Sequence, residues 1–386
     1  MTRVKILHTS DWHLGKMLYG RSLLEDQAYF VERQFFPILE KERPDCVVLA
    51  GDVFDRQIAP VEAIRLFDRV IEHVSQTFGI PLLAAAGNHD GPDRMAVGAR
   101  LLRRANVYIA GRPEQAGEPV VLRDREGEVR FYLVPYLEPA SFRERQAEIR
   151  TCQDAYRYWL EQIGPIGKPG VRNVMVGHLF AAGAVSSASE TVYLGGAGQV
   201  AASLFDPFDY VALGHLHRAQ RAGENGWYSG SPLPYSFDEG SGEKSMRLVT
   251  LTNSGVEVRP IPVAPLRGMR ILRGDFETLL QAGQNEPVTD YLSIELTNAL
   301  PVFEPMARLR EVYPNLLCLR GGWMAQPAVE QEDRRKLRED LLDRKAGDAA
   351  VFEAFLRQVC GEEPEEEDRH IFQAACAKAD REEAGT

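Results

Sequence analysis

Five short apolar runs, each followed at once by a turn rich in glycine and polar residues, constrain this chain more than any other feature. The runs cover residues 4–7, 46–50, 81–85, 171–176 and 210–213. Continuous apolar runs of this length, separated by helical patterns, are typical of parallel strands buried on both faces. They predict an α/β fold whose polar turns lie at the carboxyl ends of strands, where open α/β sheets gather their ligand sites.

The polar turns carry side chains of the kinds that bind metal ions. We predict seven of them as ligands: Asp11, His13, Asp52, Asn88, His178, His215 and His217. Oxygen and imidazole ligands suit Mn²⁺, Fe²⁺ or Zn²⁺, and no cysteine takes part. Four glycines directly precede expected ligands, at places where a positive φ or a close backbone approach would exclude a larger residue. They are Gly51, Gly87, Gly177 and Gly214.

The number of ligands predicts a site for two divalent cations. Asp11, His13, Asp52 and His217 would form one shell and Asn88, His178 and His215 most of the other, with Asp52 bridging the ions. Two metals roughly 3.5–4 Å apart stabilise both the attacking and the leaving oxygen of a displacement at phosphorus. The sequence therefore predicts hydrolysis of a phosphate ester, with the cations attracting an anionic substrate.

His89 adjoins the expected ligand Asn88 but is left over from the ligand count. A histidine beside the metals can protonate the leaving alkoxide, so we predict His89 as a catalytic residue. Asp55 is the expected orienting carboxylate, which would fix the tautomer of His89 and raise its pKa.

These turns resemble the calcineurin-like metallophosphoesterase superfamily, whose pattern is D-x-H, G-D-x-x-D, G-N-H-[DE], G-H and G-H-x-H. Residues 6–15, 50–55 and 228–234 resemble more narrowly the SbcD family, the nuclease subunits of bacterial SbcCD complexes. The resemblance implies Mn²⁺ at the seven ligands, with His89 assisting the leaving group. Archaeal and eukaryotic relatives tend to have histidine at the position of Asp55, so the role of Asp55 is taken from the protein phosphatases.

The same resemblance implies a DNA exonuclease and endonuclease that processes DNA ends and hairpins in repair and recombination. Its expected substrates are duplex ends, hairpins and single strands. Its expected partners are an SbcC-type coiled-coil ATPase and a second copy of the chain, as a homodimer within a heterotetramer. Two alternatives stand beside it: a phosphatase or small-molecule phosphodiesterase with the same metals, and a scaffold with a silent site. The intact ligand set argues against the scaffold.

The net charge of −11 opposes a nucleic-acid binder acting alone, since neutralising phosphates ordinarily needs a basic face. The metals would reverse the charge of the pocket, and much of the acid lies in the C-terminal tail, where the run 362–368 holds six acidic residues. Arginines also flank the motifs, at Arg21, Arg56, Arg94 and Arg218.

At 386 residues the chain exceeds what one hydrophobic core usually supports. We expect residues 1–265 to form a two-sheet sandwich metallophosphoesterase core flanked by helices. Residues 228–234 and 246–251 would be strands of its second sheet. A helix over residues 62–78 would bury one apolar face, made of Ile64, Phe67, Val70, Ile71 and Val74.

Residues 266–325 predict a small α/β capping domain. Its expected strands are 269–272, 291–296 and 316–319, and its expected helices are 276–282 and 303–312. Residues 326–386 predict a helical C-terminal tail with an apolar stripe made of Val351, Phe352, Phe355, Leu356 and Val359. This stripe would either pack against the cap or dock the partner.

The five cysteines are scattered and form no C-x-x-C pair, which favours a reducing compartment. We find no leader pattern and no apolar run near the ~20 residues that span a bilayer. The sequence therefore predicts a cytoplasmic protein with no membrane segment, and the resemblance to a DNA nuclease implies that it is nucleoid-associated.

Overall fold

The computed structural model describes residues 3–142, 146, 148–190, 198–240, 242–321, 366, 368–370 and 372–373. The chain divides into two compact units. The first consists of Met1–Leu272, Glu286–Ser293 and Arg310–Cys318, and the second of Arg273–Asn285, Ile294–Leu309 and Leu319–Thr386.

Two six-stranded sheets form the frame of the first unit. One has the order β16-β15-β1-β4-β5-β6, with strands β1 (Val4–Thr9), β4 (Cys46–Ala50), β5 (Leu82–Ala85), β6 (Val107–Ala110), β15 (Lys244–Thr252) and β16 (Gly255–Val263). The other has the order β13-β14-β12-β9-β8-β7, with strands β7 (Val120–Asp124), β8 (Gly127–Val134), β9 (Val171–His178), β12 (Tyr210–Gly214), β13 (Gln220–Ala222) and β14 (Gly226–Tyr228). Strands β1, β4 and β5 run parallel to one another, as do β9 and β12.

The two sheets face each other across an apolar core, because alternate residues of each strand point to opposite faces. Ile6 and Val48 from the first sheet share this core with Phe131 and Val174 from the second. The two-sheet sandwich expected from the sequence is therefore confirmed.

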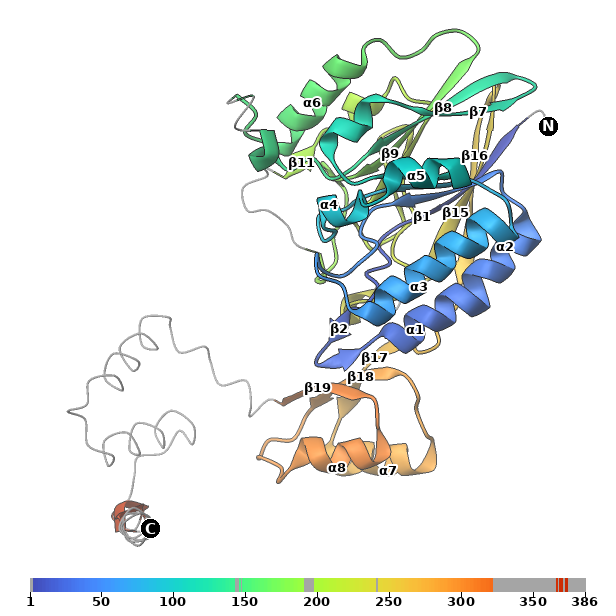
Figure 1. Cartoon of the computed structure of the whole chain (residues 1–386). Helices are drawn as coiled ribbons and strands as arrows, with labels where there is room; N and C mark the ends of the chain where they lie inside the picture. Colours follow the sequence, from blue (N-terminus) through green and yellow to red (C-terminus); the bar gives the residue numbers. More distant parts are fainter. Residues whose placement is uncertain are drawn as a thin grey trace, which may run out of the picture. The chain divides into compact units, whose positions relative to one another are not determined.

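Helices cover the outer face of each sheet (Figure 1). Helices α1 (Leu24–Tyr29), α2 (Phe36–Glu42) and α3 (Val61–Glu72) cover the first sheet, and α6 (Cys152–Ile163) covers the second. Two π-helical segments continue this layer, η1 (Phe30–Phe35) and η2 (His73–Thr77). The remaining short elements are α4 (Pro92–Met95), α5 (Ala99–Leu102), β2 (Met17–Leu18), β3 (Arg21–Ser22), β10 (Phe180–Ala181), β11 (Gln199–Val200), and the 3-10 turns η3 (Arg103–Ala105), η4 (Pro113–Gly117), η5 (Pro139–Phe142), η7 (Ala202–Phe205) and η8 (Phe237–Glu239).

Three sequence-based details of this unit are corrected by the structure. Ile64 is 49% exposed, because the buried face of α3 runs through Leu66, Phe67 and Val70. The strand expected at 246–251 lies in β15 of the first sheet, where it pairs antiparallel with β1. In the region 228–234, β14 ends at Tyr228 and the rest is irregular chain.

The elements expected after residue 265 are confirmed. They are β17 (Met269–Gly274), α7 (Phe276–Asn285), β18 (Tyr291–Leu296), α8 (Pro305–Val312) and β19 (Leu316–Gly321), with the sheet order β17-β18-β19. Asp275 begins α7 by accepting backbone N–H groups of Glu277 and Thr278 at 3.0 and 3.3 Å. The apolar stripe at 351–359 lies outside the described residues.

Among the helices that the structure describes, none combines the length and apolar character that crossing a bilayer requires.

Candidate active site

The seven expected ligands follow the carboxyl ends of five strands that belong to both sheets. Strands β1, β4 and β5 lead into the loops of Asp11, Asp52 and Asn88, while β9 ends at His178 and β12 leads to His215. The single sheet edge expected from the sequence is therefore replaced by the neighbouring edges of two facing sheets.

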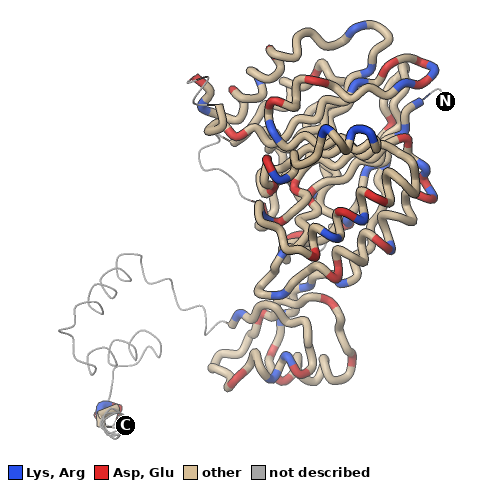
Figure 2. Tube along the Cα trace, in the orientation of Figure 1, with Lys and Arg blue, Asp and Glu red and all other residues tan. Residues whose placement is uncertain are grey.

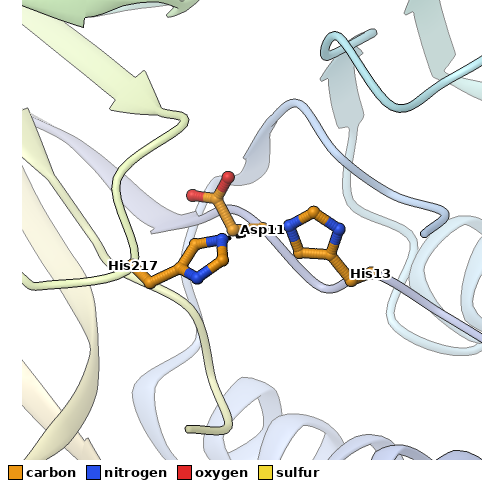
Figure 3. Close-up of side chains that lie close together, drawn as sticks. All are labelled: Asp11, His13 and His217. Carbon is orange, nitrogen blue, oxygen red and sulfur yellow. Dashed lines mark hydrogen bonds between the residues drawn. The ribbon is translucent and has the colours of Figure 1, made fainter. Parts of the chain in front are cut away.

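Asp11, His13 and His217 form the first cluster, in which one ligand atom from each residue lies within 4.8 Å of the others. Figure 3 shows the three side chains together, with the rings of His13 and His217 beside the carboxylate of Asp11. The Nε2 atoms of His13 and His217 are 3.1 Å apart, and all three residues are buried. Two imidazole nitrogens at this distance share at most one proton, so at least one lone pair is directed into the cluster.

Asn88, His178 and His215 form the second cluster. The Oδ1 atom of Asn88 lies 3.0 Å from His178 Nε2 and 3.0 Å from His215 Nδ1. The other ring nitrogen of His178, Nδ1, lies 3.0 Å from the carbonyl oxygen of Ala50. Because a carbonyl can only accept, His178 carries a proton on Nδ1, and Nε2 is the ring nitrogen that faces Asn88 and is available to a metal ion.

Asp52 lies between the clusters. Its Oδ2 atom is 3.6 Å from His13 Nε2 and 3.3 Å from His178 Nε2, while Oδ1 accepts the backbone N–H of His89 at 2.9 Å. One carboxylate thus faces a ligand of each cluster, which is the arrangement that a bridging ligand needs.

Backbone strain is concentrated in these loops. Eight non-glycine residues have a positive φ in the part of the chain that the structure describes, and four of them are expected ligands. They are Asp11 (φ 54°), His13 (φ 45°), Asp52 (φ 49°) and His215 (φ 101°). A non-glycine residue in this region costs about 1–3 kcal/mol, and such residues cluster at functional sites.

Three of the four glycines before the ligands, Gly51, Gly87 and Gly214, are required by close contacts. A β-carbon on Gly87 would overlap Oδ1 and the backbone nitrogen of Asp52, and one on Gly214 would overlap the carbonyl oxygen of Ala50. Gly51 has a φ of 85°, and a β-carbon there would also overlap the ring of His178. A larger residue at Gly51 or Gly214 would push the two sheet edges apart, and one at Gly87 would displace Asp52.

Burial and neighbouring charge perturb the ligands strongly. Burial raises the pKa of Asp11 to about 6 and lowers the pKa of His215 to about 3. Burial also opposes the charged forms of His178 and Asp52, but the attraction between the imidazolium and the carboxylate outweighs it. This attraction raises the pKa of His178 to about 9 and holds the pKa of Asp52 well below its usual range. Asp11 and Asp52 each have a carboxylate oxygen within 4.8 Å of the other, and a divalent cation would stabilise such a pair of buried charges.

The residues present fit a divalent metal site. Oxygen and imidazole donors converge from separate loops, and thiolates take no part, which is a hard-to-borderline donor set. The Nδ1 atom of His13 is buried without a hydrogen-bond partner. Hydrogen bonding within the protein therefore does not explain why this imidazole is buried here.

The contact expected between Asp55 and His89 differs in the structure. His89 Nδ1 lies 2.8 Å from the backbone carbonyl oxygen of Asp55, so the backbone orients the ring. The carboxylate of Asp55 instead accepts from Lys16 Nζ at 2.8 Å and lies 3.6 Å from His13 Nδ1. The physical reason is that Lys16, from the loop of His13, reaches the carboxylate directly.

Three supporting residues were missed by sequence reasoning. Asp90 accepts the backbone N–H groups of Val53, Phe54 and Gly87 at 2.8–3.1 Å and so ties two ligand loops together. Gln27, on α1, bonds to the backbone of Gly15 and to the carbonyl of His13 at 2.8 and 2.7 Å. Glu239 lies 3.5 Å from His217 Nδ1. Only Asp90 carried a signal, as the last residue of the Gly87–Asp90 motif.

Comparisons with known proteins agree with this geometry. Residues 4–219 match the family model described as calcineurin-like phosphoesterase, and residues 265–359 match that of the type 5 capsule protein repressor C-terminal domain. Two similar proteins are named as the SbcD subunit of the nuclease SbcCD. The one from Staphylococcus epidermidis is 35% identical over 322 residues, covering 82% of this chain and 85% of the relative. The one from Staphylococcus saprophyticus is 35% identical over 368 residues, covering 93% of this chain and 94% of the relative.

A crystal structure of a dimetal phosphatase from Danio rerio matches with a TM-score of 0.40 and 11% sequence identity, covering 68% of this chain and 99% of that one. Structural and sequence similarity this low does not support a conclusion about function.

The sandwich fold and the ligand clusters at its strand ends define a metal-dependent phosphoesterase of the calcineurin-like class. Such an enzyme is a hydrolase that uses divalent metal ions. Within this class, the chain belongs to the SbcD family, the nuclease subunits of SbcCD. The resemblance inferred from the motifs is thereby confirmed.

Proposed function

We propose that this chain is a two-metal DNA exonuclease and endonuclease, the nuclease subunit of an SbcCD-type complex that processes DNA ends and hairpins. The observation that carries the proposal is the convergence of seven ligand-type side chains, from loops as far apart in the sequence as those of Asp11 and His217, on two clusters that Asp52 connects. The names of the relatives support the nuclease reaction and the complex.

In this proposal the metal ions are Mn²⁺, held by Asp11, His13, Asp52, Asn88, His178, His215 and His217. Divalent cations at these ligands would supply Lewis acidity at phosphorus and lower the pKa of water. Substrate binding and proton transfer would depend on side chains of the protein. Asn88 and His89 are only partly buried, so the substrate would enter from their side of the cluster.

In this proposal His89 acts as the general acid for the leaving oxygen. Since its Nδ1 donates to the carbonyl of Asp55, the ring is fixed, and Nε2 is the atom left to exchange a proton with the substrate. Its ring also packs edge-on against that of His13, with centroids 4.8 Å apart. This holds His89 beside a ligand.

The acidic net charge is compatible with DNA binding if the contacts are local. Lysine, arginine, aspartate and glutamate are mixed along helices α1 to α3 (Figure 2). Arg218 pairs with Asp238 at 3.0 Å, whereas Arg56 and Arg94 are exposed close in sequence to Asp55 and His89. We therefore expect the metal centre, with cations such as these, to supply most of the attraction for phosphates.

The proposed division of labour assigns catalysis to residues 1–265, capping to 266–325 and partner docking to 326–386. The separate family models matched at 4–219 and 265–359 support a boundary near residue 265. The proposed partner is an SbcC-type coiled-coil ATPase, and the proposed location is the cytoplasm, at the nucleoid.

A homodimer is also part of the proposal, and exposed apolar side chains support it. Val97, in the turn between α4 and α5, is 74% exposed, and Leu101, in α5, is 71% exposed. We expect Leu101→Glu to convert a dimer of the chain into a monomer, since a buried unpaired charge is costly, as measured by light scattering after gel filtration. Leu300→Glu, at a leucine that is 78% exposed, is the matched control and should leave the dimer intact.

The substrate class is tested by incubating the chain with Mn²⁺ and end-labelled duplex or hairpin DNA, beside a generic phosphomonoester. We expect cleavage of the DNA, lost on chelation by EDTA and restored by Mn²⁺. Hydrolysis of the monoester alone would favour the alternative, a phosphatase.

A further inference from the structure

We propose that Glu239, acting through Ser189, is a positioning residue that fixes which ring nitrogen of His217 faces the metal site. This inference rests on the proposed metal site and adds residues that lie outside the set of ligands.

Glu239 lies in a buried ion pair. It is 3% exposed, and its Oε2 atom is 2.5 Å from Nζ of the buried Lys244. Lys244 Nζ also donates to Ser231 Oγ at 2.9 Å and to the carbonyl oxygen of His217 at 3.1 Å. A buried ion pair is costly unless further hydrogen bonds satisfy it, and these contacts do so. Glu239 is therefore ionised, and both of its oxygens can only accept hydrogen bonds.

The other carboxylate oxygen faces His217 through a serine. Glu239 Oε1 accepts from Ser189 Oγ at 2.6 Å, and the same Oγ lies 2.6 Å from His217 Nδ1. A serine hydroxyl has one proton. Because that proton is donated to the carboxylate, Ser189 accepts from His217, and Nδ1 must carry the ring proton.

This proton assignment decides the function of the opposite nitrogen. With Nδ1 protonated, the lone pair of His217 is on Nε2, which lies 3.1 Å from His13 Nε2 in the first cluster. Histidine ligands are generally held by a second partner in this way, and removal of that partner typically weakens metal binding by 10–100-fold. The backbone N–H of His217 also donates to Glu190 Oε1 at 2.5 Å, so the residue is fixed at several atoms.

The structure provides a matched pair of variants to test this role. Ser189 and Ser236 each donate to Glu239 Oε1, at 2.6 and 2.8 Å. Of these two serines, only Ser189 has a described hydrogen bond to His217. We expect Ser189→Ala in the full chain to weaken binding of one of the two Mn²⁺ equivalents about 10–100-fold, as measured by titration calorimetry. Ser236→Ala should change that affinity by less than about threefold.

A second readout reports the tautomer directly. In the metal-free protein, long-range ¹H–¹⁵N spectra of the histidine rings should show the His217 proton on Nδ1 in the wild type and in Ser236→Ala. In Ser189→Ala, the population with the proton on Nε2 should increase. Glu239→Gln, with its folding checked by thermal unfolding in EDTA, should weaken the same Mn²⁺ equivalent.

The proposal is overturned if Ser189→Ala binds both ions with wild-type affinity, if both serine variants lose affinity equally, or if the wild-type ring proton is on Nε2. These measurements do not depend on DNA cleavage. A chain that binds two Mn²⁺ ions but cleaves no DNA would refute the proposed nuclease function and leave this inference standing.

Discussion

Asp52→Ala is expected to remove both metal ions and to reduce hydrolysis by at least about a thousandfold, equivalent to about 4 kcal/mol in the activation barrier. The reason is its place between the clusters, where Oδ2 lies 3.6 Å from His13 Nε2 and 3.3 Å from His178 Nε2. Without this carboxylate, two sets of imidazoles would face each other with less negative charge to hold two cations. Bound manganese, measured by elemental analysis after desalting, should fall from about two per chain to well below one.

Asp124→Ala provides the control for loss of a buried carboxylate. The side chain of Asp124 is 4% exposed and pairs with Arg172 at 2.6 Å, on strand β7 in the second sheet. This variant should lose stability, by about 3–5 kcal/mol for a buried pair that is broken, but keep both ions. If Asp52→Ala still binds two ions, the bridging assignment is wrong.

The sequence predicted the strands and the positions of the ligand loops well because both depend on local patterns. Apolar runs of strand length precede Asp11, Asp52 and His178, and strands are found there. The sheet to which a strand belongs depends on long-range pairing, which is why 246–251 was placed in the second sheet although β15 pairs with β1.

The structure brings the seven expected ligands together, but their supports had little local signal. Glu239 and Gln27 are single polar residues in ordinary sequence, and their importance arises only from chain that folds back on the ligand loops. For Asp55 the sequence did carry a signal, but it did not determine which atoms make the contact. Its motif predicted that it would be near His89, but whether the side chain or the backbone makes the contact depends on Lys16, a residue of another loop.

His89→Ala is expected to reduce DNA hydrolysis by about 10²–10⁴-fold while sparing metal binding. The ring is held by the backbone of Asp55 at 2.8 Å rather than by a ligand carboxylate, so its removal leaves the seven ligands in place. Manganese content and the rate of cleavage of labelled duplex DNA give the two quantities. His73→Ala, at a histidine on η2, is the control for the general effect of removing an imidazole and should retain activity.

The role in protonating the leaving group can be separated from a role in binding. A nitrophenyl phosphodiester has a leaving group that needs little protonation, so His89→Ala should slow its hydrolysis far less than that of DNA. Equal losses on both substrates, at full metal content, would mean that His89 acts in positioning the phosphate. A loss of metal would instead make His89 a ligand, which its place within 4.8 Å of ligand atoms of His13 and Asp55 would then explain.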